Sequence, residues 1–345
     1  MMIPDQWYAV LESDEVKPGK PAAFRRLNHD LVFWRDDSDK LVVMQDRCPH
    51  RQTKLSGGKI VNNSIECPFH GFQYNESGEC QLVPANGKNG PRPKQFRAKA
   101  YPVREAHGFI WVWNGEPRPK KDYPPIPFFD GLENFSYGTL RKEWNTHYTR
   151  AIENQLDVAH VPFVHATTIG REGKTLVNGP YSLIEGDAIY VWYDNQKDHG
   201  QHANKPSELP RPDRPWLLCF KYPNVWLNRL SDKMMIMAAF VPIDDEHTMM
   251  YVRFYHNFVK SGLARKLISA LSPFANSRIL KQDEAVVVSQ EPKEGGLDSG
   301  DKYIPADRPI LLYHTHRQEL IRAAALDHEF NTREAPEYSE ERVAS

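Results

Sequence analysis

Two short segments of the chain each pair a cysteine with a histidine. The four residues are Cys48 and His50, separated by one proline, and Cys67 and His70, separated by Pro-Phe, with sixteen residues between His50 and Cys67. Two thiolates and two imidazoles suit a two-iron cluster that has both cysteines on one iron and both histidines on the other. Neutral imidazoles raise the reduction potential above that of an all-cysteine cluster. The pattern therefore predicts a redox centre.

A zinc site is the competing interpretation of these four residues. Zinc sites usually leave two or more residues between neighbouring ligands, whereas only Pro49 separates Cys48 from His50. The spacing therefore favours the iron cluster. The remaining cysteines, Cys80 and Cys219, belong to no such motif, and we expect them to be structural thiols.

A second group of candidate ligands lies between positions 153 and 165. Glu153, Asp157 and His160 follow the spacing i, i+4, i+7, which predicts one stripe of a helix. Pro162 removes a helical hydrogen bond just after this stripe, so His165 need not obey helical spacing. The two imidazoles can then converge on one metal ion.

An iron that activates dioxygen needs two histidines and one carboxylate on one face, with open positions opposite. Asp283 shares a mostly apolar helical stripe with Ile279 and Val287, whereas Glu284 points toward Lys281. A carboxylate turned toward a core is costly unless it is paired or bound to metal. We therefore predict Asp283 as the third ligand.

Two further histidines, His314 and His316, could chelate a metal through their i, i+2 spacing. A strand with both imidazoles on one solvated face is the simpler interpretation, and we assign them no role.

The elements that must position these ligands fall into two groups. Residues 1–115 contain several short strands and are predicted to form a small all-β domain. The segment 116–129 has five prolines in fourteen positions and is predicted to be a linker. A second domain is expected over residues 130–330 and a polar tail over 331–345.

The second domain combines helices with strands of an antiparallel sheet. Helical spacing covers Tyr148–His160, and residues 262–291 are expected to be helical and kinked or divided at Pro273. The predicted strands are Ala188–Tyr193, Trp216–Tyr222, Met234–Val241 and Met249–Phe258.

Composition excludes several classes of protein. The 345 residues carry 44 Lys and Arg against 45 Asp and Glu, without a basic cluster, so no nucleic-acid or anionic-lipid partner is expected. The longest apolar run, Met234–Val241, has eight residues, and no basic residue precedes Lys17, so neither a membrane span nor an export signal is expected. Four cysteines favour a reducing cytoplasm. No nucleotide-binding glycine motif occurs.

The first group of candidate ligands, the two cysteine-histidine pairs, resembles the Rieske 2Fe-2S domain. The pattern of that domain is C-x-H, some sixteen residues, then C-x2-H. Thr53 and Phe69 stand where the respiratory-chain branch has disulfide cysteines, so the similarity is to the oxygenase branch. Gln52 departs from the glycine common in these oxygenases. The second constellation resembles the D-x2-H-x4-H motif and later aspartate of the Rieske non-haem iron oxygenases, the oxygenase (alpha) components of the aromatic-ring-hydroxylating family. The likeness covers most of residues 1–320.

This resemblance implies an α+β fold, with an N-terminal all-β Rieske domain and a C-terminal helix-grip catalytic domain containing an antiparallel sheet. It implies one 2Fe-2S Rieske cluster on Cys48, His50, Cys67 and His70, and one mononuclear Fe(II) on His160, His165 and Asp283. Dioxygen would be the cosubstrate. Electrons would come from NAD(P)H through a separate reductase or ferredoxin. Asp157 would act as a catalytic electron bridge from His160 to the cluster histidine His70 of the partner subunit, in a head-to-tail homotrimer.

The implied function is that of a terminal oxygenase that hydroxylates or oxidatively demethylates an organic small molecule, aromatic or alicyclic. Two alternatives stay open. A ring dioxygenase would perform cis-dihydroxylation with the same ligands, whereas a Rieske electron-transfer protein would need only the first constellation. The compact chain favours a monooxygenase or demethylase, and its substrate pocket is expected between about residues 170 and 290, where apolar residues predominate.

Overall fold

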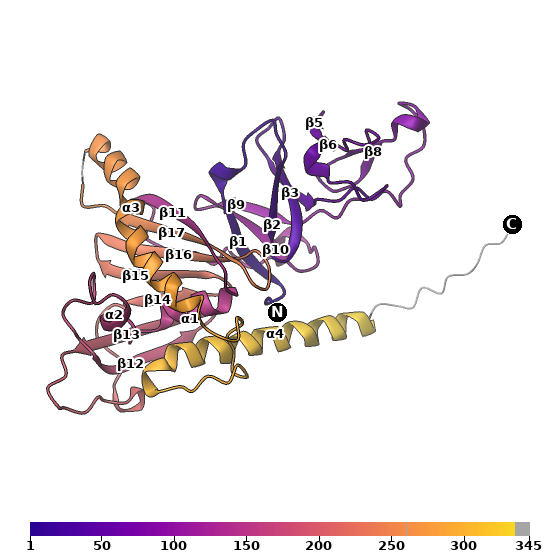
Figure 1. The fold of residues 1–345 in the computed structure, drawn as a ribbon. Coiled ribbons are helices and arrows are strands. Elements are labelled where there is room, and N and C mark those ends of the chain that lie inside the picture. Colours follow the sequence, from indigo (N-terminus) through magenta and orange to yellow (C-terminus); the bar gives the residue numbers. More distant parts are fainter. Residues whose placement is uncertain (260, 335–345) are drawn as a thin grey trace.

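The computed structural model describes residues 1–259 and 261–334, without side-chain detail for 273–276 and 327–334. The fold is α+β, as predicted. Small sheets form the N-terminal region, coloured indigo to purple in Figure 1, and one large antiparallel sheet with helices forms the C-terminal region. No helix in the described ranges is long and apolar enough to cross a membrane.

The N-terminal region folds into three antiparallel sheets, with the strand orders β1-β10-β9, β2-β3-β4 and β5-β6-β7-β8. The strands are β1 (Gln6–Glu12), β2 (Ala22–Arg26), β3 (His29–Arg35), β4 (Leu41–Gln45), β5 (Lys59–Val61), β6 (Ser64–Glu66), β7 (Gln73–Tyr74), β8 (Cys80–Leu82), β9 (Val103–Ala106) and β10 (Phe109–Asn114). Short 3-10 helices span Ser13–Glu15, Leu55–Gly57, Pro84–Asn86 and Lys120–Asp122.

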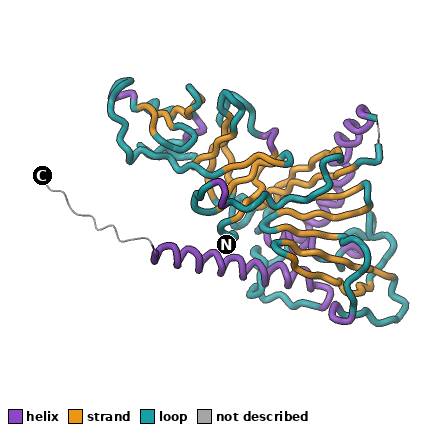
Figure 2. Tube along the Cα trace, turned by 180° about the vertical axis from the view of Figure 1, so that it is seen from behind, coloured by secondary structure: helices purple, strands orange, loops and turns teal. Residues whose placement is uncertain are grey.

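The C-terminal region contains one seven-stranded antiparallel sheet in the order β11-β17-β16-β15-β14-β13-β12. Its strands are β11 (Ser136–Trp144), β12 (Leu176–Glu185), β13 (Ala188–Gln196), β14 (Leu218–Lys221), β15 (Val225–Ser231), β16 (Met234–Pro242) and β17 (Thr248–His256). The helices are α1 (Tyr148–Leu156), α2 (Val161–Val164), α3 (Gly262–Val287) and α4 (Arg308–Glu334), with 3-10 turns at Pro206–Glu208 and Pro305–Asp307. Figure 2, seen from behind, shows the strands in front of α3.

Both faces of the large sheet are covered, which explains the long apolar run of β16. Ala238 and Phe240 belong to the core shared with α1, α3 and α4, whereas the alternating residues Met237 and Ala239 belong to the core shared with β1 and β10. Successive side chains of a strand point to opposite faces. A central strand with two buried faces therefore reads as a continuous hydrophobic segment.

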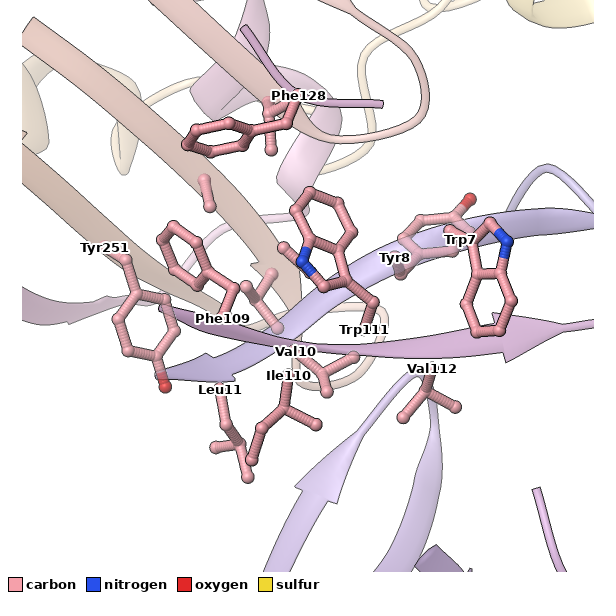
Figure 3. Packing of buried hydrophobic residues seen from close by; sticks show 14 of the residues in the cluster. Trp7, Tyr8, Val10, Leu11, Phe109, Ile110, Trp111, Val112, Phe128 and Tyr251 are labelled. Carbon is pink, nitrogen blue, oxygen red and sulfur yellow. The ribbon is translucent and has the colours of Figure 1, made fainter. Parts of the chain in front are cut away.

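Aromatic side chains of the N-terminal region cover the second face of the large sheet. Figure 3 shows Phe109 and Trp111 on the side of β10 that faces Phe128, and Ile110 and Val112 on the opposite side. All four side chains on β10 are buried. The linker residue Phe128 is thus part of the core, so the two regions share a hydrophobic interior.

A buried ion pair also joins the two regions. Glu12, at the end of β1, accepts hydrogen bonds from Arg253 Nε at 2.8 Å, Thr139 Oγ1 at 2.7 Å and Arg141 Nε at 2.9 Å. Arg253 is fully buried, and its guanidinium carbon lies 3.5 Å from the ring centroid of Phe109. One carboxylate from the first region therefore neutralises charges of the second.

The structure corrects two sequence expectations about helices, namely a division at Pro273 and a strand at His314 and His316. Pro273 does not divide its segment, because α3 runs as one helix from Gly262 to Val287. The hydroxyl of Ser272 donates to the carbonyl of Ser269 at 3.2 Å, the group that a proline nitrogen at position 273 cannot satisfy. His314 and His316 lie in α4 instead of a strand.

Candidate active site

Helix α1 ends earlier than its spacing predicted. Its last residue is Leu156, and Asp157 is extended, with φ −70° and ψ 124°. The Asp157 carboxylate atom Oδ1 accepts hydrogen bonds from the backbone N–H of Ala159 at 2.6 Å and of His160 at 3.3 Å. These bonds stabilise a turn, after which the chain restarts as α2. The expected single helical stripe of Glu153, Asp157 and His160 is therefore wrong.

Glu153 does not belong to the group formed by the two site histidines and instead contacts other side chains. Its Oε1 atom lies 2.5 Å from Nε2 of His314, and its Oε2 atom accepts a hydrogen bond from Nη1 of Arg150 at 2.9 Å. All three side chains are buried. His314, to which the sequence assigned no role, thus joins α4 to α1, the helix that leads into the site.

The structure brings His160, His165 and Asp283 together, although α3 supplies Asp283 from more than a hundred positions along the chain. One ligand atom of each residue lies within 4.8 Å of the other two. Asp283 Oδ1 lies 3.0 Å from Nε2 of His165 and 3.6 Å from Nε2 of His160. His165 and Asp283 are buried, and His160 is largely so.

The hydrogen bonds at the far side of each ring fix which nitrogen is free. His160 Nδ1 lies 3.1 Å from the backbone carbonyl oxygen of Asp157, and a carbonyl can only accept, so Nδ1 carries the proton. His165 Nδ1 likewise lies 3.1 Å from the amide oxygen Oε1 of Gln282. With that proton on Nδ1, each ring can present an Nε2 lone pair toward Asp283, the arrangement that metal-binding histidines use.

The Asp283 carboxylate provides a direct test of whether a metal ion fits. Its Oδ1 atom is buried and has no hydrogen-bond partner in the part of the chain that the structure describes, although His165 Nε2 is only 3.0 Å away. A buried unpaired carboxylate oxygen is costly. A cation held jointly by this oxygen and the two Nε2 atoms removes that cost, and the donor set of two imidazoles and one carboxylate suits Fe(II).

Charge in the site is set by these contacts. Burial raises the pKa of Asp157, but hydrogen bonds from His160 and from the Ala159 backbone hold the pKa below its ordinary value, so this carboxylate is ionised at neutral pH. Burial lowers the pKa of His165, and the Asp283 carboxylate more than offsets this, so the net shift of the pKa is upward. The Asp157 carboxylate thus adds a negative charge beside His160, and Asp283 stabilises the protonated form of His165.

Sequence reasoning missed two residues that shape this site. Gln282 accepts from His165 Nδ1, as noted, and also from the Thr168 hydroxyl at 3.0 Å. Gly170 donates its N–H to the carbonyl of His165 at 2.9 Å, and a Cβ at this position would lie 2.1 Å from the carbonyl oxygen of Val161. The position of Gln282 directly before Asp283 was the available signal, whereas no local pattern marks Gly170.

A cavity of about 250 Å³ opens beside the three residues, between α3 and the large sheet. The side chains that line it are mostly aliphatic or aromatic. Its lining from α3 and strands β13 to β17 lies within the region where the sequence predicted a substrate pocket, whereas the part between Gln155 and Ile169 lies before that region. A mainly apolar cavity next to a polar cluster is the usual form of a small-molecule site.

The two cysteine-histidine segments form a pair of loops in the N-terminal region. Cys48 donates its backbone N–H to the carbonyl of Thr53, and Cys67 donates to that of Phe72, both at 2.8 Å. Both thiols are buried, and the Oη atom of Tyr74 lies 3.3 Å from the sulfur of Cys48. Each loop therefore begins with a buried cysteine whose N–H is bonded within the loop.

The four side chains separate into a thiol pair and an imidazole pair. Burial raises the pKa of Cys67, and a hydrogen bond between the thiols of Cys48 and Cys67 contributes to that rise. The rings of His50 and His70 have centroids 4.7 Å apart. His70 is exposed, whereas both cysteines are buried. This arrangement fits a cluster whose cysteine-bound iron is internal and whose histidine-bound iron faces the surface.

Comparison with known protein families agrees with this division. Residues 6–102 match the profile of the Rieske [2Fe-2S] domain, and residues 144–323 match that of the vanillate O-demethylase oxygenase C-terminal domain. The second match alone covers more than half of the chain. The chain belongs to the Rieske non-haem iron oxygenases.

Individual relatives extend this finding. The methylxanthine N1-demethylase NdmA of Pseudomonas putida is 27% identical over 331 residues, which cover 92% of this chain and 89% of NdmA. The protein TIC 55 of Pisum sativum is 32% identical over 210 residues, 59% of this chain. The chain spans only about a third of the length of the chloroplast relatives, 37% for this TIC 55 and 34% for the pheophorbide a oxygenase of Oryza sativa subsp. japonica.

A solved structure shows the same fold. Dicamba monooxygenase bound to dicamba aligns with a TM-score of 0.73 and 18% identity, covering 94% of this chain and 99% of that one. As a Rieske oxygenase, the chain takes a Rieske 2Fe-2S cluster and a mononuclear iron as cofactors. Enzymes of this family receive their electrons from a reductase or ferredoxin and act on small molecules.

Proposed function

We propose that this chain is a terminal oxygenase that uses dioxygen and externally supplied electrons to hydroxylate or oxidatively demethylate an aromatic or alicyclic substrate. The observation that carries the proposal is the triad of His160, His165 and Asp283 at one end of the apolar cavity. The similar proteins NdmA and dicamba monooxygenase are named as a demethylase and a monooxygenase, which supports this choice.

In this proposal the two site histidines and Asp283 hold the mononuclear iron, which supplies dioxygen activation when bound. The hydrogen bonds to the Asp157 carbonyl and to Gln282 hold a proton on Nδ1 of each ring, which directs Nε2 to the metal and fixes the orientation of the ring. The apolar lining of the cavity excludes water from the reacting C–H bond and places that bond beside the triad.

Cys48, Cys67, His50 and His70 hold the Rieske cluster in the same proposal. Because His70 is exposed, the histidine end is the surface at which electrons enter and leave. The strands β5 to β8 near the cysteine loops and helix α2 at the second site lie at opposite ends of the molecule (Figure 1). A homotrimer in which the cluster of one subunit serves the site of the next would bridge this separation.

Asp157 is the residue that we assign to that junction. Its carboxylate is 28% exposed, so it reaches the surface, and its Oδ2 atom lies 3.7 Å from Nδ1 of His160. It can therefore contact a partner subunit while it adjoins an iron ligand. We also place the enzyme in the cytoplasm, since Cys80 and Cys219, which hold no cluster in this proposal, form no disulfide, as is usual in a reducing compartment.

Turnover with isotope-labelled dioxygen tests the proposed function. The iron-loaded protein, supplied with a surrogate reductase and a set of methoxy- and methyl-substituted ring compounds, should form a product that contains one labelled oxygen or release formaldehyde. A product with two labelled oxygen atoms on neighbouring carbons would instead show a ring dioxygenase. About two irons per chain instead of about three, with no product, would indicate an electron-transfer protein.

A further inference from the structure

Two rows of side chains that run across the large sheet line one wall of the cavity beside the triad. We call these two rows the floor. Leu218, Asn228, Ile236 and Phe254 are paired in register on β14, β15, β16 and β17, and all four line the cavity. Trp226, Ala238 and Val252 form the adjacent row. Asn228 is the one polar residue in these seven positions. It occupies the middle of an otherwise apolar floor.

Charged groups in the described lining are confined to the metal end of the cavity. Asp157, Asp283 and the two site histidines lie there, and the described lining contains no lysine or arginine. A substrate carboxylate or sulfonate bound over the sheet would therefore be buried without a cationic partner, which is costly. Residues 273–276 of α3, whose side chains are not described, read Pro-Phe-Ala-Asn and add no charge. The cavity favours an uncharged ligand.

Two polar side-chain groups of the floor have no hydrogen-bond partner among the described residues and can bind a ligand. The half-buried side-chain amide of Asn228 forms no hydrogen bond with another residue in the described part of the chain. Trp226 is 4% exposed, and its Nε1–H likewise lacks a partner among the described residues. An indole N–H can only donate, and an amide can donate as well. A ligand oxygen that accepts, such as a ketone oxygen, is therefore a suitable partner for either group.

The size of the cavity limits the ligand further. Its volume of about 250 Å³ lies below the 300–1,000 Å³ typical of sites for drug-sized ligands. A single ring or a compact bicyclic compound fits such a space, whereas a tetrapyrrole of the kind named in the pheophorbide a oxygenase relatives is far larger.

We propose that the substrate of this chain is an uncharged single-ring or compact bicyclic compound whose hydrogen-bond acceptor is recognised by Asn228, with Trp226 as a second donor. This inference rests on the proposed function, since it takes the cavity beside the triad as the substrate site. It names Asn228 as a specificity-determining residue on β15, two positions after Trp226 on the same face of the sheet.

Binding of three matched ring compounds to the iron-loaded protein tests the proposal. Methoxybenzene carries no second polar group, 4-methoxyacetophenone adds a neutral acceptor, and 4-methoxybenzoate adds a negative charge at the same position. Isothermal titration calorimetry in the absence of reductant should give the tightest binding for the ketone. We expect the benzoate to bind at least about tenfold more weakly than the ketone, because its charge is unpaired over the sheet.

Substitutions of floor residues test which side chains bind the acceptor group of the ligand. Asn228→Leu should weaken binding of 4-methoxyacetophenone roughly tenfold and leave methoxybenzene within about twofold, since one hydrogen bond is lost. Asn228→Ala serves the same purpose if the larger side chain disturbs folding, and Trp226→Phe should weaken only the ketone. Asn257→Leu is the matched control, because Asn257 is half-buried at the end of β17 and does not line the cavity.

Three outcomes would overturn the proposal. The first is binding of 4-methoxybenzoate as tight as that of the ketone. The second is an equal loss for all three compounds in Asn228→Leu, and the third is failure of the wild-type protein to bind any of them. Because no electrons are supplied, the result is separate from catalysis. Protein that binds the ketone but never forms a product from any compound would contradict the proposed function and leave the recognition by Asn228 standing.

Discussion

Gln52 occupies in the first cysteine loop the position that Gly71 occupies in the second. Each donates its backbone N–H to the carbonyl of the loop cysteine, Gln52 to Cys48 at 2.8 Å and Gly71 to Cys67 at 3.0 Å. Both have left-handed backbones, with φ of 61° and 70°. Gln52 is also the residue at which the sequence departs from the glycine common in similar oxygenases. A glutamine side chain is strained in this conformation, whereas glycine is not.

Gln52→Gly should therefore stabilise the protein by about 0.5–1 kcal/mol, because relief of the backbone strain exceeds the extra entropy of glycine in the unfolded chain. Urea unfolding of the cluster-loaded protein measures this. The reverse change, Gly71→Gln, is the matched control and should destabilise, as its Cβ would lie 3.1 Å from Pro84 Cγ. A destabilised Gln52→Gly variant would mean that the side chain makes a compensating contact.

Replacement of Asp283 tests the mononuclear iron site. Asp283→Asn removes the charge of a buried ligand oxygen that has no other partner among the described residues. Iron affinity and product formation should fall by more than about 100-fold, beyond the loss seen when only a residue behind a ligand is changed. Metal analysis should then give about two irons per chain, with an unchanged Rieske spectrum.

Glu284→Gln is the control for that variant. Its carboxylate lies 3.6 Å from Nζ of Lys142, outside the triad, so the variant should keep its iron and its activity. Iron retention in Asp283→Asn together with iron loss in Glu284→Gln would move the third ligand by one position.

Changes at the cluster histidines test the Rieske assignment. His50→Cys or His70→Cys should shift the visible and EPR spectra toward those of an all-thiolate cluster and lower its potential, because a neutral ligand becomes a charged one. Cys80→Ser should leave both spectra as they are, since the Cys80 sulfur is directed to the carbonyl of Leu82 at 3.5 Å. Unchanged spectra in either histidine variant would rule out that residue as a ligand.

Asp157→Asn separates electron transfer from metal binding. The amide oxygen of asparagine can replace Oδ1 as acceptor for the backbone N–H groups of Ala159 and His160, so the turn and the iron should persist. The negative charge beside His160 is lost, and oxidation of the pre-reduced cluster in a single turnover should slow by orders of magnitude. Stopped-flow absorbance follows this step.

Asp157→Ala is the companion variant, because it removes the acceptor of the turn as well as the charge. It should lose iron in addition to electron transfer. A wild-type rate in iron-loaded Asp157→Asn would place the route between subunits elsewhere, and iron loss in that variant would assign Asp157 a purely structural role.

Protonation of His147, the residue that caps α1, should make the stability of the protein depend on pH. Its Nδ1 atom accepts from the backbone N–H of Thr149, and burial lowers its pKa to about 4 from an ordinary 6.5. Between these values the unfolded chain binds more protons than the folded one, so stability falls on acidification. The loss by pH 5 should be about 2 kcal/mol relative to pH 7.

His147→Asn retains a capping acceptor but cannot titrate, so its stability should fall by about 2 kcal/mol less between pH 7 and pH 5. Urea midpoints at the two pH values supply the comparison. The exposed His199→Asn is the control and should behave as the wild-type protein does. An equal change in urea midpoint between pH 7 and pH 5 for wild-type protein and His147→Asn would show that protonation of this ring is not linked to unfolding.

The sequence was most informative where ligands are local. The spacing within each cysteine loop and between His160 and His165 is set by short turns, and the apolar surroundings of Asp283 distinguished it from Glu284. The end of α1 was missed because helical spacing cannot register a side chain that captures backbone N–H groups, as Asp157 does. The helix around His314 was missed because its partner Glu153 is 161 positions away.

The pair of Glu12 and Arg253 has a consequence for how such enzymes can be recombined. A chimera joined within the proline-rich segment 116–129 would take the carboxylate from one parent and the fully buried guanidinium from the other. Unless the donor parent also has an acid at the end of its first strand, the arginine would be buried as a lone charge, at a cost of several kcal/mol. Modular exchange of electron-supplying domains among relatives is therefore restricted by an ion pair that involves none of the predicted metal ligands.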